Sequence, residues 1–158
     1  DAEAVARAAR FDFVERLDVA HLQEHAIEVQ LPFLLRCLQS GFSLVPFVVG
    51  QATIVQVGAV LDELWGGEET LIVVSSDLSH MHDYDTARRL DRSTSRAIEN
   101  LSPELLHEGD ACGRVAIQAL LTAAAQRGLV VRTVDLRNSG DTAGGHDEVV
   151  GYGAYVIN

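Results

Sequence analysis

The stretch that most constrains the fold of this chain is LIVVSSDLSHMHDY, residues 71–84. It opens with an unbroken apolar run, residues 71–74, typical of a β-strand whose sheet is buried on both faces. Two histidines, two aspartates and three serines follow within nine residues. Because sites in open α/β sheets lie beyond the carboxyl ends of the strands, we expect this cluster to be either part of an active site or a solvated turn before a helix.

Segments with strand and helix patterns alternate along the rest of the chain. We expect strands over residues 42–50, 70–76, 129–137 and 149–157, and helices over residues 24–38, 53–64, 85–100 and 112–126. Pro32 is expected to kink or break its helix, Thr53 to cap the next one, and Gly128 to stop the last. The alternation predicts a single α/β domain over residues 1–158, with a mixed, partly parallel sheet flanked by helices.

The charge of the chain excludes two classes of partner. It has 23 acidic residues and 12 basic ones, all of them arginine, and a formal net charge of −11. Such a surface repels nucleic acid and anionic membranes, so we expect neither as a partner. No apolar stretch approaches the roughly 20 residues of a membrane helix, and the charged N-terminus is unlike a signal peptide. The two cysteines make no disulfide framework, so we expect a cytoplasmic protein.

The first candidate site segment is HLQEHAIEVQLPF, residues 21–33. His21 and His25 are four residues apart, and His25 and Glu28 are three apart, so one helix face could carry all three. That spacing suits metal binding. The alternative is a helix start with exposed polar residues.

The second candidate segment is SSDLSH, residues 75–80, within the polar cluster. Asp77 could act as a general base or orient a neighbouring imidazole. His80 could bind a metal ion or donate a proton. The alternative is that Asp77 and Ser79 cap the next helix and that His82 is a solvated loop residue.

The third candidate segment is DACGRVAI, residues 110–117. Cys112 lies at a predicted helix start, where the helix dipole and free N–H groups favour the thiolate that binds metals. Arg114 adds positive charge and could hold a carboxylate. The alternative is a small buried cysteine, and this is the interpretation we adopt for Cys37 on its apolar helix.

The fourth segment is the glycine-rich stretch 137–153, which matches neither the dinucleotide fingerprint nor a P-loop. Its glycines could let the backbone approach a ligand, and a flexible loop explains them equally well. Asp141 and His146 are its candidate site residues.

Across these segments, the side chains of His25, His80 and Cys112 are the ligand types of a mononuclear transition-metal site. Asp77 and Glu28 lie near them in the sequence. Imidazole and thiolate together suit iron, copper or zinc and do not suit magnesium or calcium.

The segments EHAIEVQLPFL, VVSSDLSHMHDYDTARRLD and ACGRVAI resemble, in this order, the signature segments of the Memo family. The bacterial members of that family are called AmmeMemoRadiSam system protein B. The tail DLRNSGDTAGGHDEVVGYGAYV is similar to their C-terminus. The resemblance covers nearly the whole chain from about residue 21 onward.

The resemblance implies an α/β fold like that of the class III extradiol dioxygenases, which use non-haem iron. It also implies a pocket in which two histidines and a cysteine hold iron or copper. By motif, His25 and Cys112 match metal ligands. Asp77 and His80 match pocket residues that could bind the metal or act in acid–base chemistry.

The function implied by the resemblance is a metal-dependent, dioxygenase-like oxidoreductase acting on a small molecule. His80 would then be the catalytic acid or base, and Asp77 would orient it. The name of the bacterial members implies a radical-SAM protein and an AMMECR1-type protein as partners. The alternatives are a non-catalytic module that binds a peptide or protein partner in the same pocket, and an inert fragment of the enzyme fold.

One departure from the family pattern concerns the N-terminus. The second ligating histidine of the family sits in a PHAGY-like motif that this sequence does not contain. We therefore expect the chain to begin about 100 residues into a typical member and to lack its N-terminal strands. A sheet without those strands exposes edges, so self-association into a homo-oligomer is a further expectation.

Overall fold

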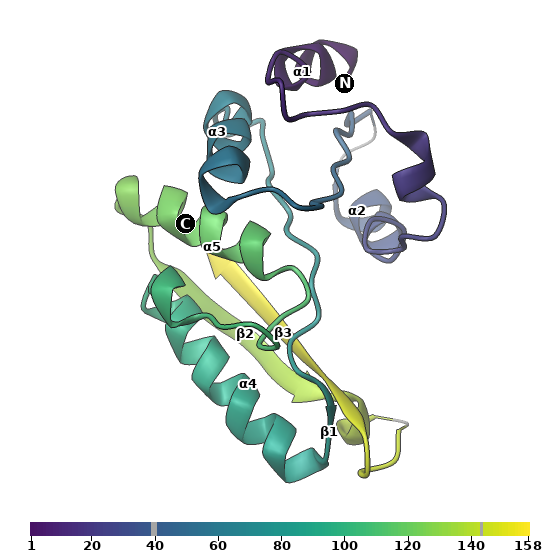
Figure 1. The fold of residues 1–158 in the computed structure, drawn as a ribbon, viewed down its shortest axis with the longest axis vertical. Coiled ribbons are helices and arrows are strands. Elements are labelled where there is room, and N and C mark those ends of the chain that lie inside the picture. Colours follow the sequence, from purple (N-terminus) through teal and green to yellow (C-terminus); the bar gives the residue numbers. More distant parts are fainter. Residues whose placement is uncertain (39–40, 143) are drawn as a thin grey trace. The chain divides into compact units, whose positions relative to one another are not determined.

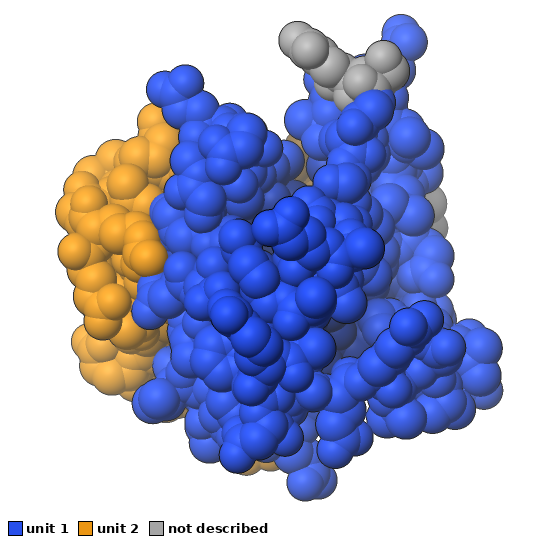
Figure 2. Space-filling model, turned by 90° about the horizontal axis from the view of Figure 1, so that it is seen from above, with its two compact units in different colours: residues 1–75 blue, residues 76–158 orange. Residues whose placement is uncertain are grey.

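The computed structural model describes residues 1–38, 41–142 and 144–158. The chain divides into two compact units, residues 1–75 and residues 76–158, which Figure 2 colours separately. The single-domain expectation therefore stays a prediction.

The first unit is helical. It contains α1 (Ala2–Ala8), α2 (Leu31–Cys37), α3 (Ile54–Leu64) and the short 3₁₀ helix η1 (Asp18–His21). α1 and α3 are joined by Glu63, whose carbonyl accepts a hydrogen bond from Arg7 at 3.0 Å and whose carboxylate pairs with Arg10 at 2.7 Å. The predicted N-cap of α3 is confirmed, because the Thr53 side chain accepts the Gln56 amide in a capping box.

Two expectations for the first unit are wrong. The helix predicted over residues 24–38 is confined to α2, which begins next to Pro32, so the pattern is broken at this proline and not kinked by it. The strand predicted over residues 42–50 is not formed. A run of β-branched residues becomes a strand only when a neighbouring strand supplies hydrogen bonds, and among the described residues none pairs with this segment.

The strand predicted over residues 70–76 is likewise extended chain without ladder pairing. Its side chains are not buried on both faces, since Leu71 is 62% exposed and Val73 is 46% exposed. The polar cluster therefore does not follow a regular strand. Its residues 80–82 instead form a short strand themselves.

The second unit is a three-stranded antiparallel sheet with helices, and Figure 1 shows α4 running alongside β2 and β3. Its elements are β1 (His80–His82), α4 (Tyr84–Glu99), η2 (Pro103–Leu105), α5 (Arg114–Gln126), β2 (Val131–Asn138), η3 (Ser139–Asp141) and β3 (Val149–Ile157). The predicted helices over 85–100 and 112–126 and the predicted strands over 129–137 and 149–157 are confirmed within two residues. Gly128, at φ +67°, follows α5 as expected.

The sheet has the order β1-β3-β2, so β3 is its central strand. Both pairings are antiparallel. The chain thus has a mixed α/β architecture with five α-helices among its described residues. The parallel pairing and the likeness to extradiol dioxygenases stay predictions.

α4 packs on β2 and β3, and residues of α5 join the same core. The core cluster is formed by Ala97, Ile98, Leu106 and Leu121, with the partly buried Ile117, Val131, Tyr155 and Ile157 packed against it. The contributing strand residues lie at alternate positions, as a half-buried strand requires. No helix among the described residues is long and apolar enough to cross a membrane.

β1 contains a bulge. His80 pairs with Val150 and His82 with Val149, so Met81 is an extra residue between them. The φ angle of Met81 is +60°, a left-handed backbone conformation that residues other than glycine adopt at a cost in free energy.

β3 and α4 meet most closely at Gly151. A Cβ atom at this position would lie 2.2 Å from a carboxylate oxygen of Asp91, a residue of α4. The backbone of β3 thus lies directly on that carboxylate. Any side chain at residue 151 must displace that carboxylate or shift the strand.

We expect Gly151→Ala to lower the free energy of unfolding by about 1–3 kcal/mol, the range for overpacked interiors. Gly145→Ala is the control, because a Cβ atom there would have nothing within 4 Å, and it should change the value by less than about 0.5 kcal/mol. Urea denaturation followed by circular dichroism measures both. Equal values for the two variants would contradict the described packing.

A second prediction concerns the N-cap of α4. The Asp83 carboxylate accepts the Thr86 amide at 3.0 Å, and hydrogen bonds from Thr86 lower the pKa of Asp83. A lowered folded-state pKa stabilises the fold above the unfolded pKa, and this stabilisation is lost as the pH falls through the folded pKa. Asp83→Asn should therefore show a smaller loss of melting temperature than wild type between about pH 5 and about pH 2. Asp85→Asn is the control, because Asp85 is exposed in the first turn of α4, and this variant should behave as wild type does.

Candidate functional site

Two segments that are 35 residues apart in the sequence interlock in the second unit. The Asp77 amide donates to the Cys112 sulfur at 3.2 Å, and the Cys112 amide donates to the Asp77 carbonyl at 3.2 Å. Ser76 strengthens this contact, because its hydroxyl accepts the Gly113 amide at 2.8 Å and lies 3.4 Å from the Cys112 sulfur. The structure therefore brings together two of the candidate segments, SSDLSH and DACGRVAI.

His80 adds an imidazole to this site. Its Nε2 atom lies 3.3 Å from a carboxylate oxygen of Asp77, and the two side chains are 42% and 47% exposed. Asp77 is therefore placed to orient the imidazole, as one of the two sequence interpretations held. The other interpretation, in which Asp77 and Ser79 cap the next helix, is wrong because Asp83 caps α4.

Cys112 is exposed and precedes the N-cap of α5, Gly113. The buried alternative for this thiol is therefore wrong. Its sulfur accepts a backbone N–H beside the start of α5. Arg114 pairs with no carboxylate among the described residues, and its guanidinium donates to the Gln118 side chain at 3.0 Å.

The interpretation of Cys37 as a buried residue is also wrong. Its side chain is exposed at the end of α2. The cause is that α2 contains no buried residue, so the apolar pattern around Cys37 does not correspond to a packed face here.

The first candidate segment belongs to the first unit. His21 ends η1 and the exposed His25 lies in the turns before α2, so the two histidines do not share one helix face as predicted. Glu24 is held by its own backbone, because its carboxylate accepts the Ala26 amide at 2.8 Å. His25 and Glu28 thus remain candidates by sequence, and the predicted convergence of His25 with His80 and Cys112 stays a prediction.

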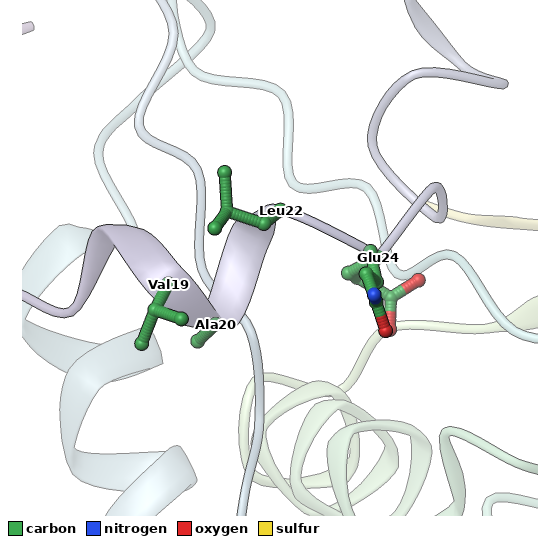
Figure 3. A pocket seen from close by; sticks show the side chains of 5 residues that line it. Val19, Ala20, Leu22 and Glu24 are labelled. Carbon is green, nitrogen blue, oxygen red and sulfur yellow. The ribbon is translucent and has the colours of Figure 1, made fainter.

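An open hollow of about 480 Å³ lies beside this segment (Figure 3). It is lined by Val19, Ala20, Leu22, Gln23 and Glu24. All of these residues come from one short stretch of chain. Polar groups from different elements do not converge in it, so the hollow lacks the features of a ligand site.

The described residues contain no preformed three-ligand metal site. Over residues 1–38, 41–142 and 144–158, no three histidine, cysteine or carboxylate side chains cluster as a metal cage. The contacts of Asp77 with His80 and with Cys112 are therefore pairwise.

The glycine-rich loop candidates, Asp141 and His146, both contact Tyr84. The Tyr84 hydroxyl donates to Asp141 at 2.5 Å, and the Tyr84 and His146 rings stack with centroids 4.4 Å apart. The shared hydrogen bond raises the pKa of Tyr84 and lowers that of Asp141. These groups satisfy one another, so their evident role is to hold the loop against the start of α4.

Sequence reasoning missed Asp91. This side chain is 2% exposed, and its carboxylate accepts the Ser79 amide at 3.0 Å. Burial raises the pKa of Asp91. The signal was present, because Asp91 lies in the stripe of α4 that also carries the buried Ala87 and Ser95, where an acid is out of place.

Comparisons with known proteins agree with the resemblance noted in the sequence. The sequence model of the family described as Memo-like protein matches residues 1–156. A MEMO1 family protein of Aquifex aeolicus is 35% identical over 96% of this chain and 61% of its own length. A MEMO1 family protein of Methanococcoides burtonii is 36% identical over 89% of this chain and 57% of its own length. The chain thus spans less than two thirds of the curated relatives it matches.

The interlock of the two segments yields one prediction. Ser76→Ala removes the acceptor of the Gly113 amide, so we expect the free energy of unfolding to fall by about 1–2 kcal/mol. Ser93→Ala, at an exposed position of α4, is the control and should leave it unchanged. Urea denaturation of both variants checks this. A Ser76→Ala variant as stable as wild type would mean that the hydroxyl does not join the segments.

Proposed function

Because the chain belongs to the Memo-like protein family, we propose that it contributes to a pocket for one iron or copper ion and that this pocket carries out dioxygenase-like redox chemistry. The observation that supports the proposal is the meeting of a thiol, a carboxylate and an imidazole at one place. The Cys112 sulfur accepts the backbone amide of Asp77 at 3.2 Å, and His80 Nε2 lies 3.3 Å from the Asp77 carboxylate.

The donor atoms suit such an ion. Thiolate and imidazole together favour iron or copper over magnesium or calcium. The Cys112 side chain is exposed and therefore open to an ion, and metals bind cysteine as the thiolate. In this proposal Cys112, His25 and His80 hold the ion, and the ion supplies the one-electron chemistry with O₂ that side chains lack.

The chain's own residues have separate tasks in this proposal. Asp77 fixes the His80 ring by accepting the proton on Nε2, which leaves Nδ1 free to bind a ligand or to take a proton. Ser76 fixes the turn that carries the cysteine through the Gly113 amide. If His80 is not a metal ligand, the same geometry makes it the acid or base that moves the proton of a small-molecule substrate.

The remaining functional statements are also proposals. They are a small-molecule substrate, a radical-SAM protein and an AMMECR1-type protein as partners, self-association into a homo-oligomer, and the cytoplasm as the compartment. They stay proposals because this chain spans less than two thirds of the length of its relatives.

The proposal predicts the metal content of purified protein. We expect nearly equimolar iron or copper in wild type after anaerobic purification, and a loss of most of it in His25→Ala, His80→Ala and Cys112→Ala, because each removes a ligand. Elemental analysis measures this. Cys37→Ala and His107→Ala are matched controls, since both residues are exposed and lie outside the site.

Four outcomes separate the enzyme from the alternatives. Metal that is lost equally in the control variants would mean adventitious binding and would contradict the proposal. No metal in wild type would favour a binding module or an inert fold. Bound metal together with metal-dependent O₂ consumption would favour the enzyme, and bound metal without it would favour the partner-binding module.

A further inference from the structure

A buried carboxylate lies directly behind the candidate site. Among the described residues, Asp91 is the one buried side chain that carries a formal charge, and it forms no ion pair there. Burying an unpaired carboxylate is costly, so a position that only fills space is better served by an apolar residue. Its placement therefore needs a specific explanation.

The explanation lies in what the carboxylate holds. One oxygen of Asp91 accepts the Ser79 amide at 3.0 Å. Two neighbouring backbone groups, the Leu78 amide and the Ser79 carbonyl, are hydrogen-bonded to Gly151 of β3. The Leu78 amide donates to the Gly151 carbonyl at 2.9 Å, and the Gly151 amide donates to the Ser79 carbonyl at 2.8 Å. Leu78 and Ser79 are thus fixed from two sides, by α4 and by the central strand.

These two residues separate the functional side chains of the segment. Asp77 precedes them and His80 follows them. Leu78 and Ser79 are 3% and 1% exposed, whereas the side chains of Asp77 and His80 are close to half exposed. The partly exposed site therefore takes its position from a short buried stretch of backbone, and that stretch is anchored by Asp91.

We infer that Asp91 is a positioning residue for the candidate site, which holds the Ser79 amide and thereby sets where Asp77 and His80 stand relative to Cys112. A role of Asp91 in catalysis rests on the proposed function. Its role in placing the Ser79 amide does not depend on a metal. Asp91 acts through the backbone and touches neither Cys112 nor His80 in any described hydrogen bond.

Amide hydrogen exchange, measured by NMR on the whole chain, tests the inference. In Asp91→Ala we expect the Asp77 and Ser79 amides to exchange about tenfold faster, as for the loss of one ordinary hydrogen bond. Asp91→Asn keeps an acceptor oxygen, so its change should be less than about threefold. The amides in the middle of the β2–β3 ladder are the internal reference and should not change.

Thr94→Ala is the matched control. Thr94 is also buried on α4, but its hydroxyl donates to the Leu90 carbonyl of its own helix. It should leave the Asp77 and Ser79 amides as they are in wild type. If the ladder amides speed up in the same proportion as Asp77 and Ser79, Asp91 has a merely structural role and the inference is overturned. It is also overturned if Asp77 does not change.

A second readout ties the inference to the site. Co²⁺ bound by a thiolate absorbs in the near ultraviolet, so a titration reports the affinity of the site for this probe. We expect wild type to bind Co²⁺ and Asp91→Ala to bind it about tenfold more weakly, with Asp91→Asn in between. Equal affinity in wild type and Asp91→Ala overturns the inference. If wild type binds no Co²⁺, the metal proposal fails, while the exchange rates still decide the role of Asp91.

Discussion

The second unit depends on the central position of β3. This strand pairs with β2 along most of its length and with β1 at its start, and its Gly151 lies against α4. β1 is three residues long and has no other partner among the described strands. His80 of the candidate site lies in β1, so its position depends on the pairing of β1 with β3.

The sequence predicted the second unit well and the first unit poorly, and the reason is physical. Local signals define α4, α5 and the two long strands, because caps, stop residues and alternating burial act within a few residues. The segments 42–50 and 70–76 have equally strong apolar patterns, but a strand also needs neighbouring strands, which no local pattern reveals. Apolar composition predicted their propensity and could not predict their pairing.

The same distinction applies to the site. Residue types and helix-start chemistry made Asp77, His80 and Cys112 candidates, and the family resemblance favoured them over the alternatives. The structure brings these three together in pairs. Asp91 was not selected, although an acid in the buried stripe of α4 was a visible signal. Its partner is the backbone amide of Ser79, twelve residues away, and the sequence does not show which backbone group such an acid holds.

The bulge at Met81 has a consequence for how the two nearby histidines differ. In a regular strand, residues two apart face the same side, so His80 and His82 would be interchangeable neighbours. The extra residue breaks that equivalence in the main chain itself. His80 lies opposite Val150 and His82 opposite Val149, which are consecutive residues of β3 and therefore alternate across the sheet. The main chain itself thus gives the two histidines different surroundings, before any contact with Asp77 orients the His80 ring.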